Sequence, residues 1–457
     1  MSIATPIRRQ RMNPARGLAA LVVVMGLFLL LALVAAYANR NIIIEQRISA
    51  GSVRAERATQ AADSAVDWVA AMLNTGRIDD HCQPTADAAM SSFRNRYLLR
   101  NTETNGYDYV NRTNSASRFY AGCRMGVDAM HCICPSSHGQ GLAPDGGDVN
   151  SAAFRVTYDV PVSSNPPETR PATITVQVRG CANAGTMNDG CLADTSSPVT
   201  DAIVDVRAHL GLVKALPALP VATLTVGNLL SAGSATAINL ANTDPQAGVG
   251  VQAGVTPLWP SNTAPTILGP AGSAADNSSR ILAPSSAVAT QSSAPSGSGC
   301  ENGNCFFRRF FAMDQSLYKR QPAVVRVDCS TGCTLGDLES NGWTGENAGR
   351  PVFVTGNLTI DSSPTGTLGS SAVPILLVVS GTLNVSASVD LVGLIYAHDI
   401  SWSATGGSMR GAIVAAQNLT LSGTLTAAYD AEVLKRMRDT YGSFVRIPAA
   451  WNRGGTE

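Results

Sequence analysis

The chain has 457 residues, with 33 basic and 33 acidic side chains, so its formal net charge is zero. Charged residues make up only 14% of the sequence, which leaves no basic footprint for nucleic acid, and we expect no nucleic-acid partner. A chain of this length can hold more than one hydrophobic core, and its glycine, serine, threonine and alanine content favours turns and strands after the first helix.

The first predicted element is an uninterrupted apolar segment from Gly17 to Ala38. No acidic residue precedes it, but several arginines do: Arg8, Arg9, Arg11 and Arg16. At about 1.5 Å rise per residue, a helix of this length crosses the ~30 Å hydrocarbon core of a bilayer, and the basic flank favours the cytoplasmic side. We therefore expect one transmembrane helix over residues 18–38, with everything after Asn39 in the periplasm or beyond.

Three interpretations of this segment differ in where the chain is cut. It is a plain membrane anchor, or it is a secretory signal peptide cut after Ala36-Tyr37-Ala38, although the apolar region of such a peptide typically has only about 7 to 15 residues. In the third interpretation, a short basic leader ends at Gly17 and is removed, while the apolar stretch stays on the mature protein. The residues beyond Ala38 favour this third interpretation.

The apolar helix can continue directly into a polar one, because no proline occurs between Asn39 and Leu73. Asn74-Thr75-Gly76 then supplies a stop. Apolar residues at helical spacing predict a stripe that packs against a globular domain: Ala58, Ala62, Ala65, Val66, Val69, Met72 and Leu73. The joined helix would be on the order of 80 Å long, and a signal peptide would not require that continuation.

Three stretches near the amino terminus carry a family resemblance: Arg16-Gly17-Leu18-Ala19-Ala20-Leu21-Val22-Val23-Val24, Ile44-Glu45-Gln46-Arg47 and Gln60-Ala61-Ala62-Asp63-Ser64-Ala65. They resemble the N-terminal region of PilX-type minor pilins of the type IV pilus. Gly-Leu-Ile-Tyr-Ala at Gly393, Gly-Ala-Ile-Val-Ala at Gly411 and Pro448-Ala449-Ala450-Trp451 are similar to the C-terminal region of PilX-like assembly proteins. The resemblance covers both ends of the chain, and the middle carries no family motif.

The resemblance implies that a prepilin peptidase cuts after Gly17 and that the new amino terminus, Leu18, is methylated. Most major pilins have glutamate at the fifth mature position, where this chain has Val22. A carboxylate in hydrocarbon costs several kcal/mol unless it is paired, so a subunit with no neighbour above it gains by losing it. The resemblance therefore implies a minor pilin at the filament tip rather than a bulk subunit.

It further implies a non-enzymatic protein that helps a tip complex to start pilus assembly and to present or dock an adhesin, in support of twitching motility and cell adhesion. The implied partners are the other minor pilins, the major pilin, a large tip adhesin and the prepilin peptidase. The precursor would span the inner membrane, with its amino terminus in the cytoplasm and its ectodomain in the periplasm, and would move to the pilus tip and cell surface on assembly.

Two alternatives stay open. One is a membrane-anchored or secreted adhesin with a β-solenoid binding module. The other is a minor pseudopilin of a type II secretion system, which shares the helix but explains the predicted solenoid less readily.

All ten cysteines follow the membrane segment, in a compartment that permits oxidation, so we expect disulfides. Proximity suggests the pairs Cys181 with Cys191, Cys300 with Cys305, and Cys329 with Cys333, and it leaves three connectivities open for Cys82, Cys123, Cys132 and Cys134. A zinc site at His131-Cys132-Ile133-Cys134 and His138 is the alternative. Its C-x-C spacing is shorter than the usual ~2 to 4 intervening residues, so we expect no metal.

The predicted fold class is α+β, with a long N-terminal transmembrane helix, a small antiparallel sheet domain and a C-terminal β-solenoid (parallel β-helix-like) module. A leader over residues 1–17 and a helix over 18–75, amphipathic from 39, precede a disulfide-containing pilin-like domain at 76–214. Its strands are predicted at Phe154 to Val162, Ala172 to Val178 and Ala202 to Leu212, with a turn at Pro166-Pro167, and they would pack on the helix stripe.

Residues 215–299 are rich in serine, alanine, glycine and proline and predict a low-complexity region of short strands or linker. Residues 300–350 form a disulfide-containing segment. Its clustered aromatic residues are expected in a core: Phe306, Phe307, Phe310 and Phe311.

An internal repeat occupies residues 351–429. The segments that start at Val354, Val379, Tyr396 and Ala415 align, which places four apolar residues in register: Leu358, Leu383, Ile400 and Leu419. Apolar residues that alternate with polar ones, with glycine at short intervals, predict stacked β-solenoid coils. Residues 430–457 predict a capping helix and a tail, with Val433, Leu434 and Met437 on one side of the helix.

The sequence carries no catalytic motif. Its five histidines are scattered, and it has no G-x-S-x-G elbow, H-E-x-x-H pair or phosphate loop. Asp390 and Asp399 are the one carboxylate pair in the repeat region that we weighed for glycoside chemistry, and solvated turns explain both better. We therefore expect neither an enzyme nor a cofactor.

Overall fold

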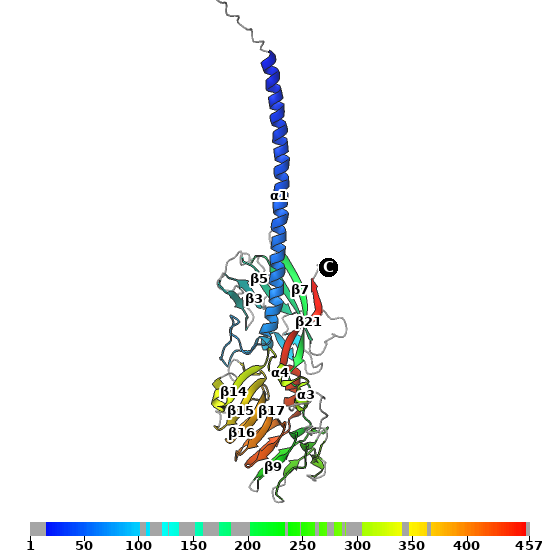
Figure 1. Cartoon of the computed structure of the whole chain (residues 1–457), viewed down its shortest axis with the longest axis vertical. Helices are drawn as coiled ribbons and strands as arrows, with labels where there is room; N and C mark the ends of the chain where they lie inside the picture. Colours follow the sequence, from blue (N-terminus) through cyan, green and yellow to red (C-terminus); the bar gives the residue numbers. More distant parts are fainter. Residues whose placement is uncertain are drawn as a thin grey trace, which may run out of the picture.

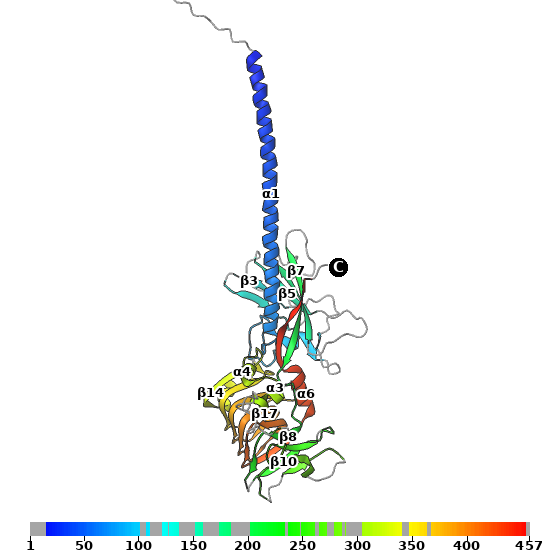
Figure 2. The same ribbon diagram turned by 45° about the vertical axis from the view of Figure 1, so that its right-hand side comes forward.

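The computed structural model describes residues 15–100, 107–109, 121–126, 128–136, 151–158, 173–183, 202–233, 236–246, 248–260, 265–271, 278–285, 288, 304–340, 347–362 and 367–453. They form one long helix and two β modules that follow each other along the helix axis (Figure 1). The first module packs on the C-terminal half of the helix, and the second lies beyond the end of the helix (Figures 1 and 2). The amino-terminal half of the helix projects away from both.

The long helix is α1 (Ala15–Met72), with 58 residues. It has no proline, and it ends where Asn74 and Thr75 begin the turn expected there. The apolar stripe predicted from helical spacing is buried throughout, with Met72 the most exposed of its residues at 7%. That stripe confirms that the helix continues well beyond a membrane segment and packs against a domain.

The first module is a six-stranded antiparallel sheet in the order β21-β7-β6-β5-β3-β4. Its strands are β3 (Ala121–Met125), β4 (Met130–Ile133), β5 (Ala153–Tyr158), β6 (Thr173–Cys181), β7 (Ile203–Lys214) and β21 (Gly442–Arg453). Strands β5, β6 and β7 confirm the three predicted strands, while the predicted end at Val162 and the Pro166-Pro167 turn lie outside the described residues. Alternate residues of β6 are buried, as expected of a sheet with one covered face.

Shorter elements complete this module. Helix α2 (Phe93–Tyr97) leads into strand β1 (Leu98–Arg100), which pairs with β2 (Tyr107–Tyr109) as an antiparallel ribbon. Phe93 and Tyr97 are fully buried with the apolar stripe of α1 and the inner face of the sheet. One hydrophobic core therefore joins α1, α2 and the antiparallel sheet.

The second module is a 13-stranded sheet in which every described pairing is parallel. The first group of strands is β8 (Ala222–Val226), β9 (Leu230–Ala232), β10 (Ala237–Ala241), β11 (Val249–Ala253), β12 (Thr266–Leu268) and β13 (Ile281–Leu282). The second is β14 (Val325–Thr334), β15 (Val352–Ile360), β16 (Ile375–Val385), β17 (Val389–Trp402), β18 (Gly407–Ala415), β19 (Leu419–Leu421) and β20 (Thr424–Ala428). The α+β class therefore holds, and the winding of these strands into solenoid coils stays a prediction.

The strand register matches the alignment of the internal repeat at its apolar positions. Leu358 pairs with Leu383, Leu383 with Ile400, and Ile400 with Leu419. The alignment is wrong by one residue at Tyr396, which pairs with Val378, because the register shifts between Val379 and Thr382. Strand β16 therefore has one more residue than β17 between the pair Val379 and Ala397 and the pair Thr382 and Asp399.

The described part of residues 215–299 belongs to this same sheet rather than to a linker. Strand β8 pairs with β18, β9 with β19, and β10 with β20, so the first group of strands continues the stack where the repeat ends. The chain then crosses to the opposite end of the sheet and begins the second group at β14.

The parallel sheet is covered by side chains on both faces where it is widest. Residues Leu377 and Val379 of β16 point into one core, and Leu376 and Val378 point into another. The second core contains the four phenylalanines of α3 (Asn304–Phe311), all at most 7% exposed, which confirms that they are core residues. Helices α4 (Gln315–Tyr318) and α6 (Ala431–Thr440) contribute to that core, while α5 (Leu335–Ser340) and the 3-10 helix η1 (Ser278–Arg280) lie elsewhere on the module.

The second module is an insertion within the first. The chain leaves the first module after Lys214, at the end of β7, and returns to it at Gly442, where β21 begins. Lys214 and Gly442 pair with each other in the antiparallel sheet. Helix α6 buries Val433, Leu434 and Met437 against the face that α3 also covers, and the residues predicted as a tail after Thr440 form the edge strand β21. The carboxyl terminus therefore returns to the helix-bearing module (Figure 1).

Candidate assembly surface

The projecting half of α1 is an apolar surface that no other described part of the chain covers. Every described side chain from Ala20 to Arg57 is exposed, including Phe28 at 70% and Val53 at 50%. Soluble proteins rarely expose a contiguous apolar surface of this size unless a membrane or a partner covers it. The exposed surface is continuous along the helix and ends where Ala58 enters the core, while its uninterrupted apolar part ends before Arg40.

Within the described residues, α1 is the one helix that is long and apolar enough to cross a membrane. No charged residue occurs between Ala20 and Asn39, and Arg40 is the first charge after that stretch. The first carboxylate of α1 is Glu45. The helix therefore changes from uncharged to mixed composition near its middle, while it stays exposed for four further turns or so at 3.6 residues per turn.

The residues predicted for processing lie at the beginning of this element. Gly17 and Leu18 are in the first turn of α1, which begins at Ala15, and their side chains are outside the described set. Val22 is 63% exposed on the free half. Where a pilin glutamate would stand, the helix therefore presents a branched apolar side chain to its surroundings.

The packed half of α1 approaches the sheet closely because both contribute small residues. Ala58, Ala61, Ala62 and Ala65 are buried at 2% exposure or less. Opposite them, a Cβ on Gly180 of β6 would lie 2.3 Å from the Ala58 carbonyl oxygen and 2.5 Å from the Ala62 nitrogen. Only glycine fits at this point of the strand, so the sequence sets the helix directly on the sheet.

The end of α1 is held by Asn74 and by the final strand. The Asn74 side-chain amide donates to the carbonyls of Ala70 and Phe444, each at 2.8 Å, and its Oδ1 accepts from the Phe444 nitrogen at 2.8 Å. Free carbonyls at the end of a helix require such partners. A side chain that the sequence suggests only as a helix stop therefore also joins α1 to β21.

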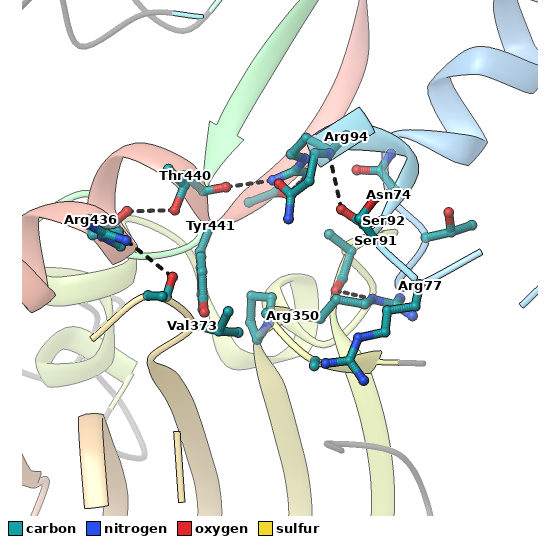
Figure 3. A pocket seen from close by; sticks show the side chains of 18 of the residues that line it. Asn74, Arg77, Ser91, Ser92, Arg94, Arg350, Val373, Arg436, Thr440 and Tyr441 are labelled. Carbon is teal, nitrogen blue, oxygen red and sulfur yellow. Dashed lines mark hydrogen bonds between the residues drawn. The ribbon is translucent and has the colours of Figure 1, made fainter. Parts of the chain in front are cut away.

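Arg94 joins the ends of both major helices. Its guanidinium donates to the carbonyl of Leu73 after α1, to that of Thr440 at the end of α6, and to that of Gly442. It also lies over the Phe444 ring, 4.7 Å from the ring centroid. Burial lowers the pKa of Arg94 from its ordinary value, but a guanidinium stays protonated in proteins. The junction of the two modules is thus organised around one half-buried cation (Figure 3).

The described disulfides fall in both modules. Cys82 is bonded to Cys134 and Cys123 to Cys132, which is one of the three connectivities left open. Because Cys132 and Cys134 are both in disulfides, neither thiolate is available for the zinc alternative, and His138 lies outside the described residues.

Of the three pairs suggested by proximity, one lies wholly within the described residues and the other two do not. A disulfide joins Cys329 to Cys333 within β14. Cys181 and Cys305 are disulfide-bonded, but their predicted partners, Cys191 and Cys300, lie outside the described residues.

The carboxylates weighed for catalysis do not face each other. Asp390 and Asp399 belong to the same strand, β17. Asp390 accepts a hydrogen bond from the Ser408 hydroxyl at 2.6 Å, and Asp399 contacts His398 and the side chain of Asn418. Each is held by its own neighbours along the stack, and no group in the described residues links the pair.

Comparisons with known proteins find matches among solved structures alone. No family model and no curated protein matches the chain. Among solved structures, the chain is similar to the competence-associated pilin ComZ from Thermus thermophilus at 11% sequence identity and a TM-score of 0.22, over 88% of this chain and 97% of that one. A TM-score of this size carries no inference about fold or function.

Sequence reasoning located the helix and its stripe but not the junction. The partners of Arg94 follow it by more than 340 residues or precede it by 21, so no local spacing indicates them. No helix end was predicted near Arg94, so the sequence gives no signal for this contact.

Proposed function

We propose that this chain is a minor pilin, processed after Gly17, that takes part in a tip complex which starts assembly of a type IV pilus. The observation that carries the proposal is the division of α1 into an exposed apolar half and a half packed on an antiparallel sheet. A helix of this kind can anchor the precursor in a bilayer and later pack among the helices of other subunits without changing its own fold. The N-terminal resemblance supports the same role.

The placement at the tip rests on the position of the second module. It continues along the axis of α1 on the side opposite to the free apolar half (Figure 1). In a filament whose subunits align their helices along its axis, the next subunit would occupy that space. A subunit that carries such a module fits at the end of the filament, and Val22 agrees with a subunit that has no neighbour's amino terminus to pair.

We also infer that the parallel sheet is wound as a β-solenoid. Support comes from β17, which pairs first with β18 over Val389 to Ala397 and then with β19 over Ile400 to Trp402. Side chains from β15, β16, β17, β18 and β19 contribute to one buried core, as inward side chains of stacked coils do. The module would then offer a rigid surface for docking a large tip adhesin, with the other minor pilins and the major pilin as partners of α1.

The mature amino terminus tests the proposal, determined by mass spectrometry on cells with and without their prepilin peptidase. We expect a chain that starts at methylated Leu18 in the first strain and an intact precursor in the inner membrane in the second. A start at Asn39, or an intact Met1 in both strains, would contradict the proposal and leave an anchored or secreted adhesin.

A deletion strain separates the remaining candidates. A minor pilin that starts assembly predicts loss of surface pili and of twitching motility. A pseudopilin of a type II secretion system predicts intact pili and failed secretion, and an adhesin without a filament role predicts intact pili and reduced attachment.

A further inference from the structure

A cavity of about 450 Å³ lies at the junction of the two modules (Figure 3). Its walls come from residues within 74–77 and 90–95 of the first module and from Ala323 and residues within 348–351 and 372–373 of the second. The segment that connects the modules contributes Arg436, Thr440, Tyr441 and Gly442. A second cavity of about 330 Å³ adjoins it and shares several lining residues: Arg77, Ala348, Gly349, Arg350 and Val373. Together they form one groove, which we call the junction groove.

The charge of the junction groove has one sign. Among the described residues that line the larger cavity, four are arginines and none is acidic. Two of these arginines build the walls. Arg94 donates to main-chain carbonyls, and Arg350 donates to the carbonyls of Ala323 and Pro322 and to the side chain of Asn347.

The other two arginines, Arg77 and Arg436, keep donors for a ligand. Arg436 donates one hydrogen bond, to the Ala372 carbonyl at 3.3 Å, and among the described residues the Arg77 guanidinium donates none. Both side chains are half-buried, and they lie on opposite sides of the cavity (Figure 3). Among the described residues that line the junction groove, none neutralises either charge.

Two carboxylates of α6 that lie near the groove, Asp439 and Glu432, are engaged elsewhere. Asp439, which is buried, pairs with Arg438 at 2.9 Å and with Lys214 at 3.6 Å. Glu432 pairs with Lys435 at 3.2 Å. These two carboxylates therefore do not neutralise the arginines of the groove, whose positive charge remains available to a ligand.

We propose that the junction groove binds an acidic peptide segment of a partner protein, with carboxylates on Arg77 and on Arg436. Guanidinium groups match carboxylates by paired, charge-assisted hydrogen bonds. Two separated cationic groups, rather than a single cluster, fit carboxylates spaced along a chain. The lining includes several small residues, Ser91, Ala348, Gly349 and Ala372, which leave room for a main chain. The inference does not depend on the pilin proposal, because the groove lies away from the free half of α1.

The test uses the full-length chain in detergent micelles and a fluorescein-labelled peptide of alternating glutamate and glycine. Fluorescence anisotropy should show binding that weakens as salt rises, because ions screen partly exposed charges. The same peptide with glutamine in place of glutamate should not bind. Arg77→Gln and Arg436→Gln should each lower affinity about tenfold, which corresponds to about 1.4 kcal/mol for each lost charged contact.

Two further variants keep the outcome interpretable. Arg77→Lys retains the charge and should retain most of the binding, which separates loss of charge from loss of fold. Arg326→Gln removes an exposed arginine of β14 outside the groove and should leave affinity unchanged. An equal loss with Arg326→Gln, or binding of the glutamine peptide, would overturn the proposal. Displacement of the peptide by inorganic phosphate at concentrations as low as those of unlabelled peptide would also overturn it, in favour of a small-anion site.

Discussion

Gly180 determines how closely the long helix lies on the antiparallel sheet. Its position in β6 faces the main chain of α1 between Ala58 and Ala62, with room for a hydrogen atom but not for a methyl group. Glycine usually weakens a strand, because it adds conformational entropy to the unfolded chain and packs no side chain. Here that cost is offset by direct contact between helix and sheet.

We predict that Gly180→Ala lowers the free energy of unfolding by about 1 to 3 kcal/mol, as overpacked core positions do. The added Cβ would lie 2.3 Å from the Ala58 carbonyl oxygen, so helix and sheet must separate. Thermal unfolding of the full chain in detergent, followed by circular dichroism, measures the change.

Gly211→Ala is the matched control. Gly211 lies in the neighbouring strand β7, and a Cβ there would meet only the Ile447 side chain at 3.4 Å. We expect a change within about 0.5 kcal/mol for this variant. Equal effects of the two substitutions would show that close packing at Gly180 is not the cause.

Local pattern predicted α1 and strands β5, β6 and β7 of the first module, but not β3, β4 or β21. Alternation in β6 and helical spacing in α1 both follow from one covered face, and each is readable within about ten residues. The contacts of Asn74 and Arg94 could not be predicted in this way, because their partner Phe444 lies about 350 residues further along the chain and only folding brings it near.

The two modules differ in how their disulfides constrain the chain. Cys82 and Cys134 are 52 residues apart and close a loop that carries α2 and strands of the first module. Cys329 and Cys333 are four residues apart and close only a short loop in β14. In the loop-entropy account, the longer loop removes more freedom from the unfolded chain.

We predict that Cys82→Ser with Cys134→Ser destabilises the first module by about 4 kcal/mol, and that Cys329→Ser with Cys333→Ser costs about 2 kcal/mol. Urea unfolding of each double variant, read by hydrogen exchange in the separate modules, gives both values. A larger loss of stability in the Cys329 and Cys333 double variant than in the Cys82 and Cys134 double variant would show that loop length does not determine how much each disulfide stabilises the protein.

For the parallel sheet, the repeat predicted which residues align but not how far the sheet extends. Leu358, Leu383 and Ile400 follow one another at short intervals, so their register could be read directly. The pairing of β8 with β18 joins Leu224 to Ile413, and short strands without a shared motif give no signal over such a separation. The composition of residues 215–299 therefore predicts only short strands or linker, whereas the structure shows that the strands there complete the sheet.

In the molecule as a whole, the second module is inserted into the first between two residues that pair with each other in the antiparallel sheet. Lys214 and Gly442 are register partners, so the two chain segments that connect the modules lie side by side. Insertions are tolerated where the ends of a segment are close in the host fold. The first module therefore retains all of its strands when the second is left out.

We predict that replacing residues 216–440 by an Asn-Gly turn gives a chain that still folds. The turn would connect β7 to β21 as a hairpin, for which Asn-Gly is well suited. Circular dichroism and protease resistance of the shortened chain should report a folded helix and sheet, and its mature amino terminus in cells should be the same as that of the parent. An unfolded product would show that the first module depends on the second for its core.

The paired connection also determines how the protein would carry tension. A pull on the parallel module enters the antiparallel sheet at Lys214 and Gly442 together and runs along β7 and β21, which extend beside α1 (Figure 1). Strand β7 is bonded to β6 from Ile203 to Gly211, so its hydrogen bonds are loaded at the same time, in shear, instead of opening one after another. A protein exposed to traction at one end and anchored by a helix at the other would resist extension through this geometry.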